Sequence, residues 1–370
     1  MPHFDIIKRS APSESFRVKS IMGSYDMTAA HTEEHFVGDI ELPEKWNIGL
    51  IVGRSGTGKT TIARELFGDC IINGYEYTHE SILDDMPKGA SVQEICLALT
   101  SVGFASPPSW LKPYAVLSNG EKMRCDLARA ILEKRDLFVF DEFTSVVDRN
   151  VAKIGSLAMQ KAIRRGGQKF IAVTCHADVE PWLMPDWVFN TDTMTFSTKD
   201  LEEQKKNRPA INLEIYETKR KREYWEVFRK YHYLNHDLNI AARTFVCYAN
   251  GQLAGFCAVL PQPHPIRKNI WRTHRTVVFP DYQGVGIASA MRHCIADDFL
   301  SRGITLCSVT SNRAMIASMQ KSPLWKCVDI GRKMCRSGAK SLPNQSGKRI
   351  TASFEYVGKS GSSRTKAEKR

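Results

Sequence analysis

The feature that most constrains the fold is the stretch "GRSGTGKTT", which follows the apolar run "NIGLIV" and precedes the helical stretch "TIARELFG". Its glycines, lysine and threonine have the spacing of a phosphate-binding loop between a strand and a helix. Backbone N–H groups of such a loop surround phosphates, the lysine reaches the β- and γ-phosphates, and the threonine reaches magnesium. The sequence therefore predicts a site for ATP and Mg2+ that is formed by Gly53, Ser55, Gly56, Gly58, Lys59, Thr60 and Thr61.

Two further apolar runs end in polar residues that suit phosphate chemistry. Asp141 and Glu142 follow "DLFVF", and His176 closes "FIAVTC". Asp141 is placed to hold magnesium together with Thr60, and Glu142 to polarise the attacking water. We predict Glu142 as a catalytic residue and His176 as a sensor of the γ-phosphate.

In their order along the chain, these motifs resemble the ABC-class ATPases. The phosphate loop is followed by the signature "LSNGE", the strand "FVFDE", the stretch "SVVD" and His176. The resemblance implies that Ser118 and Gly120 contact the γ-phosphate of ATP bound to a partner subunit, so that two copies form an ATP-clamped homodimer.

The chain departs from the transporter members of that class. Only 58 residues separate Lys59 from Ser118, and no glutamine is clearly placed for the loop that links hydrolysis to a membrane partner. Tyr25 could stack on adenine, with Phe36 as the alternative. These departures favour the soluble ABC ATPases, which act on nucleic acid or on a fused effector.

Composition predicts a cytoplasmic protein with no membrane partner. No apolar run approaches the roughly 20 residues that a spanning helix requires, and the N-terminus "MPHFDIIKRS" lacks the pattern of a secretory signal. The ten cysteines are scattered, with no C-x-x-C pair, so we expect reduced thiols in preference to zinc or disulfide roles.

Charge is divided unevenly along the chain. Residues 1–200 hold 22 Lys and Arg against 27 Asp and Glu, whereas residues 201–370 hold 30 against 13. A net charge of +17 in the second half suits a polyanion, nucleic acid first, because clustered cations neutralise phosphates. Solubility and a basic tail are the alternative explanation.

The pattern of apolar runs predicts two domains. Alternating strand-like and helical stretches favour an α/β fold with a largely parallel sheet before residue 197. We expect an ATPase domain at 1–196, a polar linker at 197–212, a second α/β domain at 213–335 and a basic extension at 336–370 with a disordered tail.

The second domain contains another strand, turn and helix. "TVVF" leads into the turn "QGVGIA", whose glycines can expose N–H groups to a pyrophosphate. This turn, with the preceding "HRTVVFPDYQG", resembles the GNAT superfamily of acyl-CoA transferases over about 215–328. The resemblance implies that acetyl-CoA or another acyl-CoA is held by Gln283, Gly284, Gly286 and Ala288.

Candidates for the acceptor side lie in "FRKYHYLNHD". His232 and Tyr233 could assist proton removal from an attacking amine, or could simply pack a helix end into the core. "YHY", a hairpin and "HRTVVFPDYQG" together resemble the Mom-type phage DNA-modification enzymes, which acylate adenine. Arg272, His274 and Arg275 form a second candidate cluster, equally explained as an exposed strand edge.

The sequence thus predicts an ATPase coupled to an N-acyltransferase that acts on nucleic acid, with DNA base modification as one outcome. The alternative is a nucleic-acid-binding ATPase whose GNAT-like domain is a non-catalytic recognition module. The acceptor, which could be DNA, RNA, protein or a small amine, is left open.

Overall fold

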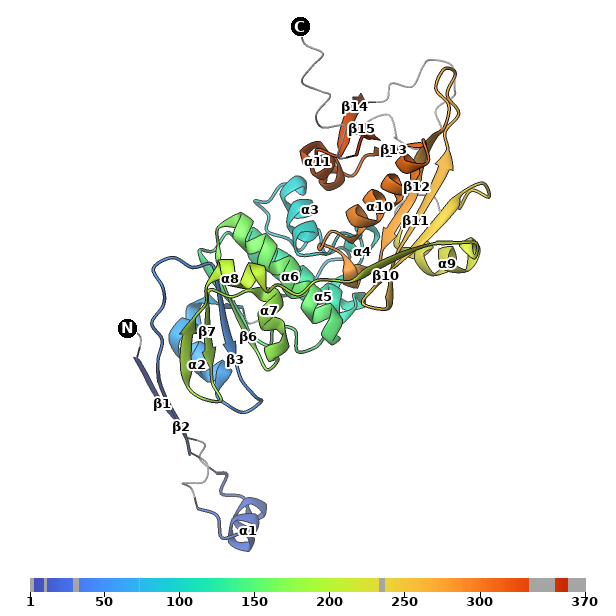
Figure 1. Cartoon of the computed structure of the whole chain (residues 1–370). Coiled ribbons are helices and arrows are strands. Elements are labelled where there is room, and N and C mark those ends of the chain that lie inside the picture. The colour runs from blue at the N-terminus through green and yellow to red at the C-terminus, as the bar shows by residue number, and fades with distance from the viewer. Residues whose placement is uncertain are drawn as a thin grey trace. The chain divides into compact units, whose positions relative to one another are not determined.

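The chain divides into two compact units. Unit 1 comprises Met1–His79, Asp85–Ala90 and Leu117–Pro209, and unit 2 comprises Glu80–Asp84, Ser91–Val116 and Ala210–Arg370. The computed structural model describes residues 3–9, 12–28, 33–72, 74–232, 237–332 and 350–358. Figure 1 shows the elements in their order along the chain.

Unit 1 contains a six-stranded sheet in the order β4-β5-β6-β3-β7-β8. Its first five strands are parallel and β8 is antiparallel to β7, which confirms the predicted largely parallel sheet. The strands are β3 (Ile48–Val52), β4 (Ile71–Ile72), β5 (Leu137–Phe140), β6 (Lys169–Thr174), β7 (Trp187–Asn190) and β8 (Thr195–Thr198).

Apolar residues of the first helix after β3 secure it to this sheet. Ile62 and Ala63 of α2 are fully buried and join a core with Ile51, Val139 and Ile171 of three strands. The helices of unit 1 are α1 (Phe16–Ser24), α2 (Lys59–Phe67), α5 (Asn119–Leu132), α6 (Arg149–Gly166), α7 (Glu180–Leu183) and α8 (Leu201–Lys206).

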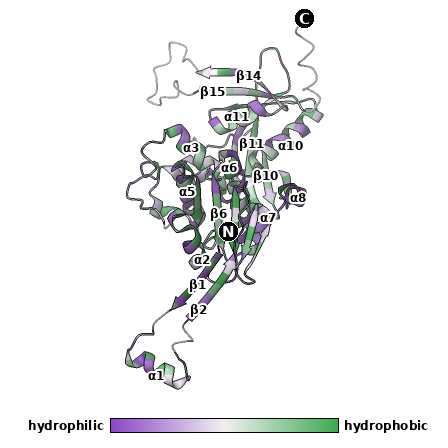
Figure 2. Cartoon of the chain, turned by 90° about the vertical axis from the view of Figure 1, so that its left-hand side faces the viewer, coloured by the Kyte–Doolittle hydropathy of each residue, from purple (hydrophilic) through white to green (hydrophobic). Residues whose placement is uncertain are grey.

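A separate antiparallel hairpin of β1 (His3–Arg9) and β2 (Glu33–Asp39) precedes the sheet. Phe4 and Phe36 of this hairpin are buried in the same core. Helix α1 lies at the far end of the hairpin, away from the sheet (Figures 1 and 2), and has no buried residue. The hairpin therefore belongs to unit 1 through its base alone.

Unit 2 contains a seven-stranded sheet in the order β14-β15-β13-β12-β11-β10-β9. All neighbours are antiparallel except β12 and β13. Asn250 and Gly251 join β10 to β11 with positive φ angles of 51° and 79°, as the predicted Asn-Gly hairpin requires. The strands are β9 (Leu213–Thr218), β10 (Arg243–Ala249), β11 (Gln252–Pro261), β12 (Ile270–Val278), β13 (Thr305–Thr310), β14 (Trp325–Arg332) and β15 (Ile350–Tyr356).

Two helices cover opposite faces of this sheet. Phe256 of β11 packs with Trp225 and Phe228 of α9 (Lys221–Phe228). The adjacent Gly255 faces α10 (Ile287–Ser301), since a Cβ there would lie 2.7 Å from Met291 Sδ. Successive strand residues point to opposite faces, so α9 and α10 enclose the sheet. The other helices of unit 2 are α3 (Val92–Ser101), α4 (Pro107–Trp110) and α11 (Arg313–Lys321).

Several segments differ from their expected roles. The expected linker contains α8, capped by the Asp200 carboxylate. The expected basic extension supplies β15, which lies between β13 and β14, because alternate residues of "ITASFEY" are buried. Ser91–Val116, expected in the ATPase domain, lies in unit 2. The rest of the expected tail lies outside the described residues.

Within the described ranges, no helix combines the length and the hydropathy that crossing a membrane requires.

Candidate functional sites

The first candidate site is the turn between β3 and α2. Gly56 and Gly58 adopt left-handed conformations with φ of 85° and 81°, which glycine tolerates without steric cost. A Cβ on Gly58 would lie 2.5 Å from the Phe36 ring, and one on Gly53 would lie 2.1 Å from Thr191 Oγ1. Gly53 is thus required by space, Gly56 by conformation, and Gly58 by both.

Hydrogen bonds hold this turn to the end of β7. Thr57 Oγ1 lies 2.6 Å from Thr191 Oγ1, and the Arg54 N–H donates to Asp192 Oδ1 at 3.0 Å. Lys59 is 7% exposed and its Nζ donates to the Arg54 carbonyl at 2.7 Å. A buried ammonium at the start of a helix, next to a glycine loop, fits the phosphates of ATP.

The predicted magnesium ligands occupy the ends of different elements. Thr60 lies in the first turn of α2, and Asp141 follows β5 directly. Asp141 Oδ1 accepts a hydrogen bond of 2.9 Å from the N–H of Glu142, whose own φ is +53°. Hydroxyl and carboxylate oxygens suit magnesium, which completes its coordination with phosphates and water.

Sheet order brings the polar strand ends to one edge. β6 lies between β3 and β5, and all three are parallel, so their carboxyl ends meet there. His176 follows β6 at this edge, and its buried Nδ1 has no hydrogen-bond partner in the described part of the chain. Burial and the nearby Arg149 lower the pKa of His176, which also lies within electrostatic range of Glu142 and Lys59. The imidazole is therefore neutral at neutral pH, with an unused ring nitrogen.

The signature residues begin helix α5. Ser118 caps this helix by accepting from the Glu121 N–H, and Gly120 is buried in the first turn. Asn119 Nδ2 donates to the carbonyl of Val146, in the stretch "SVVD", at 3.4 Å. Ser118 and Val146 are exposed, so the two motifs form one surface that a second copy could contact.

The two adenine candidates have different environments. Tyr25 follows α1 and is 73% exposed, whereas Phe36 is buried against the nucleotide turn at Gly58. Phe36 therefore shapes the turn, and Tyr25 keeps a free ring face. The remaining predicted ligands, Ser55 and Thr61, are exposed and half-buried respectively.

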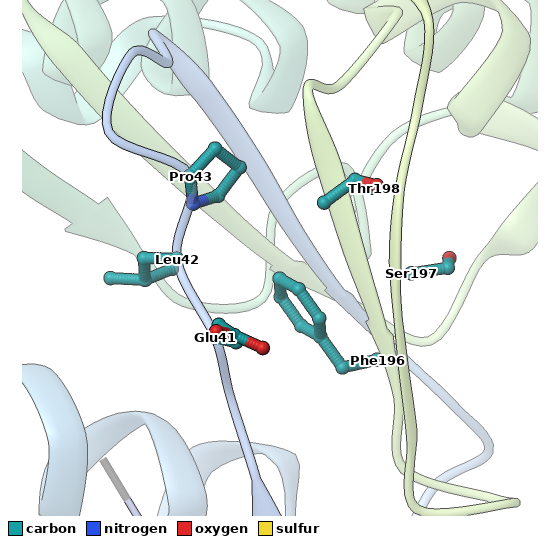
Figure 3. A pocket seen from close by; sticks show the side chains of 6 residues that line it. All are labelled: Glu41, Leu42, Pro43, Phe196, Ser197 and Thr198. Carbon is teal, nitrogen blue, oxygen red and sulfur yellow. The ribbon is translucent and has the colours of Figure 1, made fainter. Parts of the chain in front are cut away.

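A shallow pocket in unit 1 involves none of these residues (Figure 3). Ser197 and Thr198 pair with Val188 and Trp187 at the start of β7, which is the opposite end of the strand from the nucleotide turn. The pocket is lined by Glu41, Leu42, Pro43, Phe196, Ser197 and Thr198.

The second candidate site is the turn that leads into α10. Gly284 and Gly286 have φ of 81° and 99°, and a Cβ on Gly286 would meet no atom of the described residues within 4 Å. Gly286 begins α10 without a side-chain cap, and Ala288 lies in the first turn. An open, uncapped helix N-terminus fits the pyrophosphate of an acyl-CoA.

Gln283 points its side chain away from this opening. Its Oε1 accepts from the Ala105 N–H at 2.7 Å, and its Nε2 donates to the Val278 carbonyl at 2.8 Å. Both polar groups of the amide are therefore engaged by the protein. Gln283 holds the turn in place, whereas the sequence predicts it as a direct ligand.

The sheet opens beside the second turn. β12 and β13 pair only at Ile270–Thr305, Trp271–Leu306 and Arg272–Cys307, although each strand continues past these pairs. Thr273 Oγ1 donates to Ser308 Oγ at 3.0 Å where pairing stops. Beyond that point the two parallel strands carry backbone groups that an extended ligand could pair with.

The candidate residues for the acceptor side do not form one group beside this opening. His232 is 6% exposed, and its ring packs edge-on against Trp225, as its core-packing interpretation expects. Tyr233 lies outside the described residues. His274 lies on β12, where burial and the adjacent Arg275 and Arg272 lower its pKa to about 4.

Sequence reasoning missed one charged residue of α10. Arg292 is 4% exposed, its Nη2 donates to Ser289 Oγ at 3.1 Å, its Nη1 contacts Met315 Sδ, and its Nε has no partner among the described residues. Burial lowers its pKa, and of the described residues the Cys257 thiol, not a carboxylate, opposes this effect. Only its place on the buried face of an amphipathic helix could have indicated it.

Among the described residues, no group of three or more His, Cys, Asp or Glu side chains could hold a metal ion. The magnesium predicted in unit 1 needs only Thr60 and Asp141, because phosphate oxygens and water provide the other ligands.

Comparisons with known proteins separate the two regions. Residues 202–321 match the model of the acetyltransferase (GNAT) family. The chain is 33% identical over 139 residues to the mRNA export factor elf1 of Schizosaccharomyces pombe, across 30% of this chain and 13% of that protein. It is 28% identical over 186 residues to the sn-glycerol-3-phosphate import ATP-binding protein UgpC of Ruegeria pomeroyi. This match covers 41% of this chain and 52% of that protein.

The chain therefore spans about half or less of the length of these curated relatives. Among solved structures, the ribosomal-protein-S18-alanine N-acetyltransferase from Escherichia coli matches 39% of this chain and 93% of its own, with 18% identity and a TM-score of 0.30. The chain joins an N-terminal region similar to ABC ATPases to a C-terminal region similar to GNAT acetyltransferases.

Proposed function

We propose that this protein is an ATP-hydrolysing ABC-class ATPase coupled to an acyl-CoA-dependent N-acyltransferase that modifies nucleic acid. The observation that carries this proposal is the presence of two glycine turns, at Gly58 and Gly286, each with a left-handed glycine at the start of a helix. One has a buried lysine for a triphosphate, and the other adjoins an opened sheet for an acyl-CoA.

In the ATPase, Lys59 binds the phosphates, and Thr60 and Asp141 hold magnesium, which neutralises charge on the transferred phosphoryl group. Glu142 orients and polarises the attacking water, and the neutral His176 donates or accepts a hydrogen bond at the γ-phosphate. Ser118 and Gly120 act on the ATP of a second copy, so the active form is a homodimer.

In the transferase, the first turn of α10 holds the pyrophosphate, and the opening between β12 and β13 holds the acyl arm. The amine nitrogen forms a bond to the acyl carbon, the carbon–sulfur bond breaks, and the proton from the amine ends on the departing thiol. Tyr233 or His232 assists that proton transfer in this proposal.

Nucleic acid is the proposed acceptor because exposed cations gather around α9. Lys219, Arg222 and Lys230 are exposed there, and residues 201–370 carry a net charge of +17. Such clusters neutralise phosphates. The short resemblance of "YHY" and "HRTVVFPDYQG" to the Mom-type phage enzymes supports a DNA base amine as the acceptor, and the proposed setting is the cytoplasm.

A specific observation favours a second candidate function. His232 is buried beside Trp225, and the lowered pKa of His274, about 4, makes that imidazole a weak base at neutral pH. Unit 2 could then recognise nucleic acid without transferring an acyl group, while unit 1 hydrolyses ATP.

Mass spectrometry of nucleosides tests the proposal. DNA is incubated with the protein, acetyl-CoA, ATP and magnesium, and is then digested. We expect an acetyl-sized mass increase on one nucleoside, which is lost in Lys59→Ala. Acetyl-CoA binding without any adduct, and with DNA binding retained, would favour the recognition function.

A further inference from the structure

The chain between the nucleotide turn and the signature reaches the acyl-CoA turn. Ser91–Val116 belongs to unit 2, whereas Leu117–Pro209, which begins with the signature, belongs to unit 1. Within unit 2, the N–H of Ala105 donates to Gln283 Oε1 at 2.7 Å. One short segment is therefore joined covalently to the signature and by a hydrogen bond to the second turn.

We propose that Ser91–Val116 couples nucleotide binding to acyl-CoA binding, with the contact between Ala105 and Gln283 as the coupling point. This inference rests on the proposed function and assigns its regulation. Gln283 is a positioning residue here, because its amide acts on the adjacent Gly284 and Gly286 through the backbone.

The contact can transmit a displacement because Gln283 has no freedom to absorb it. Its Nε2 is held by the Val278 carbonyl at 2.8 Å, at the end of the opened strand β12. A shift of Ala105 must either move Gln283, and with it the turn, or break the hydrogen bond of 2.7 Å. Both results change the geometry of the turn and of the strand end beside it.

An electrostatic link reaches the other side of the opening. Burial raises the pKa of Cys96 on α3, and the guanidinium of Arg313 at the start of α11 opposes this rise, so the two side chains lie within electrostatic range of each other. The segment thus bonds to the turn before α10 and lies within electrostatic range of the start of α11.

The stretch of chain from Ala105 to the signature is short and is held by hydrogen bonds within unit 2. Ala105 precedes Ser118 by 13 residues. Trp110 Nε1 donates to the Phe104 carbonyl at 2.9 Å, and Ser81 Oγ donates to the Trp110 carbonyl at 3.0 Å. Pro107, Pro108 and Pro113 restrict the backbone in between, which in this proposal limits how much of a displacement the segment can absorb.

The size of the effect follows from the contact. Making or breaking a single hydrogen bond changes a binding affinity by about fivefold. This value lies at the lower end of the coupling that is typical between two binding sites. Because coupling free energies are reciprocal, acetyl-CoA must change the affinity for the nucleotide by the same factor.

Titration calorimetry on the full chain tests this coupling. The Kd of acetyl-CoA is measured with and without a non-hydrolysable ATP analogue and magnesium, and we expect a change of about fivefold. Ala105→Pro removes the N–H donor and should bring the ratio within about twofold of unity. Ala105→Gly keeps the donor and is the matched control, with the wild-type ratio.

A wild-type ratio near unity, or an unchanged ratio in Ala105→Pro, overturns the coupling while leaving acyl-CoA binding intact. Failure of the wild type to bind acetyl-CoA overturns the proposed function together with the coupling. If Ala105→Pro does not fold, Gln283→Leu removes the same contact and must bring the ratio of the two Kd values close to unity. Hydrogen exchange at 283–286 gives an independent measure, and an unchanged rate on adding the analogue alone contradicts the proposal.

Discussion

The two glycine turns use one local design in different surroundings. At Gly58 and at Gly286, a strand leads into a glycine with positive φ that begins a helix without a side-chain cap. A Cβ on Gly58 would strike the Phe36 ring, whereas a Cβ on Gly286 would meet nothing within 4 Å. The first turn is closed at Gly58 by its own unit, and the second is open at Gly286.

Their positive charges also differ. Lys59 lies at the first position of α2 and bonds to its own loop. Arg292 lies six residues beyond Gly286, inside the buried face of α10, and reaches the first turn only through Ser289. The two turns share an uncapped helix N-terminus. They differ in the position of the nearby cation and in the space around the glycine at the start of the helix, and these differences bear on which ligand each turn suits.

Removing the charge of the first turn should have the largest effect. We expect Lys59→Ala to reduce ATP hydrolysis by about 100-fold or more, because a preorganised contact to the transferred phosphoryl group is lost. A phosphate-release assay measures the rate. Lys45→Ala, at an exposed lysine of the same unit, is the control and should retain the wild-type rate.

Adding a methyl group at each helix start tests the difference in enclosure. Gly286→Ala introduces only left-handed strain, which costs about 1–2 kcal/mol of unfolding free energy. Gly58→Ala adds a collision with Phe36 at 2.5 Å, so we expect a total loss of about 3 kcal/mol or more. Urea unfolding of both variants measures the difference. Equal losses would contradict the contrast, and Phe36→Leu should rescue Gly58→Ala in part.

Replacing Arg292, the buried cation of α10, tests whether its guanidinium lacks an anionic partner. We expect Arg292→Met to raise the unfolding free energy by about 1–3 kcal/mol, because a desolvated guanidinium without a carboxylate gives way to an apolar side chain. The control is Arg302→Met, which removes an exposed ion pair with Asp298 at the end of the same helix. It should change the unfolding free energy by less than about 1 kcal/mol. A loss of stability in Arg292→Met would reveal a buried anionic partner.

The histidines near the two turns should give the smallest effects. The pKa of His274 is about 4 in the folded protein and about 6.5 in an unfolded chain. The unfolded state therefore binds more protons between these values, so stability falls as pH drops from about 6.5 toward 4. Thermal unfolding from pH 7.5 to 4 should show a weaker fall in His274→Gln. An identical pH profile in the two proteins would exclude His274 as the cause.

His176 in unit 1 has a pKa lowered in the same direction, first by burial and then by Arg149. Its contribution to stability is likewise present above the ordinary histidine pKa and is lost as pH falls below it. His176→Gln should therefore weaken the acid-induced fall measured for the wild type, in addition to any effect on ATP hydrolysis.

Much of the architecture could be predicted because it follows local patterns. The parallel sheet of unit 1 and the Asn250-Gly251 hairpin follow from apolar runs and turn residues. The structure brings Lys59, Glu142 and His176 to one edge, as the motif order indicates. Their roles, the homodimer, the acyl acceptor and the roles of His232 and Tyr233 stay predictions.

The amino-acid sequence by itself determined where each phosphate-type turn lies, because a strand, a glycine turn and a helix are adjacent in the chain. Only the tertiary structure decided that Gln283 contacts Ala105, 178 residues away, that Arg292 is buried, and that β15 lies inside the sheet. These features depend on packing and desolvation between distant segments, which no local spacing encodes. The two glycine turns are thus local in origin, and their proposed coupling is a property of the fold.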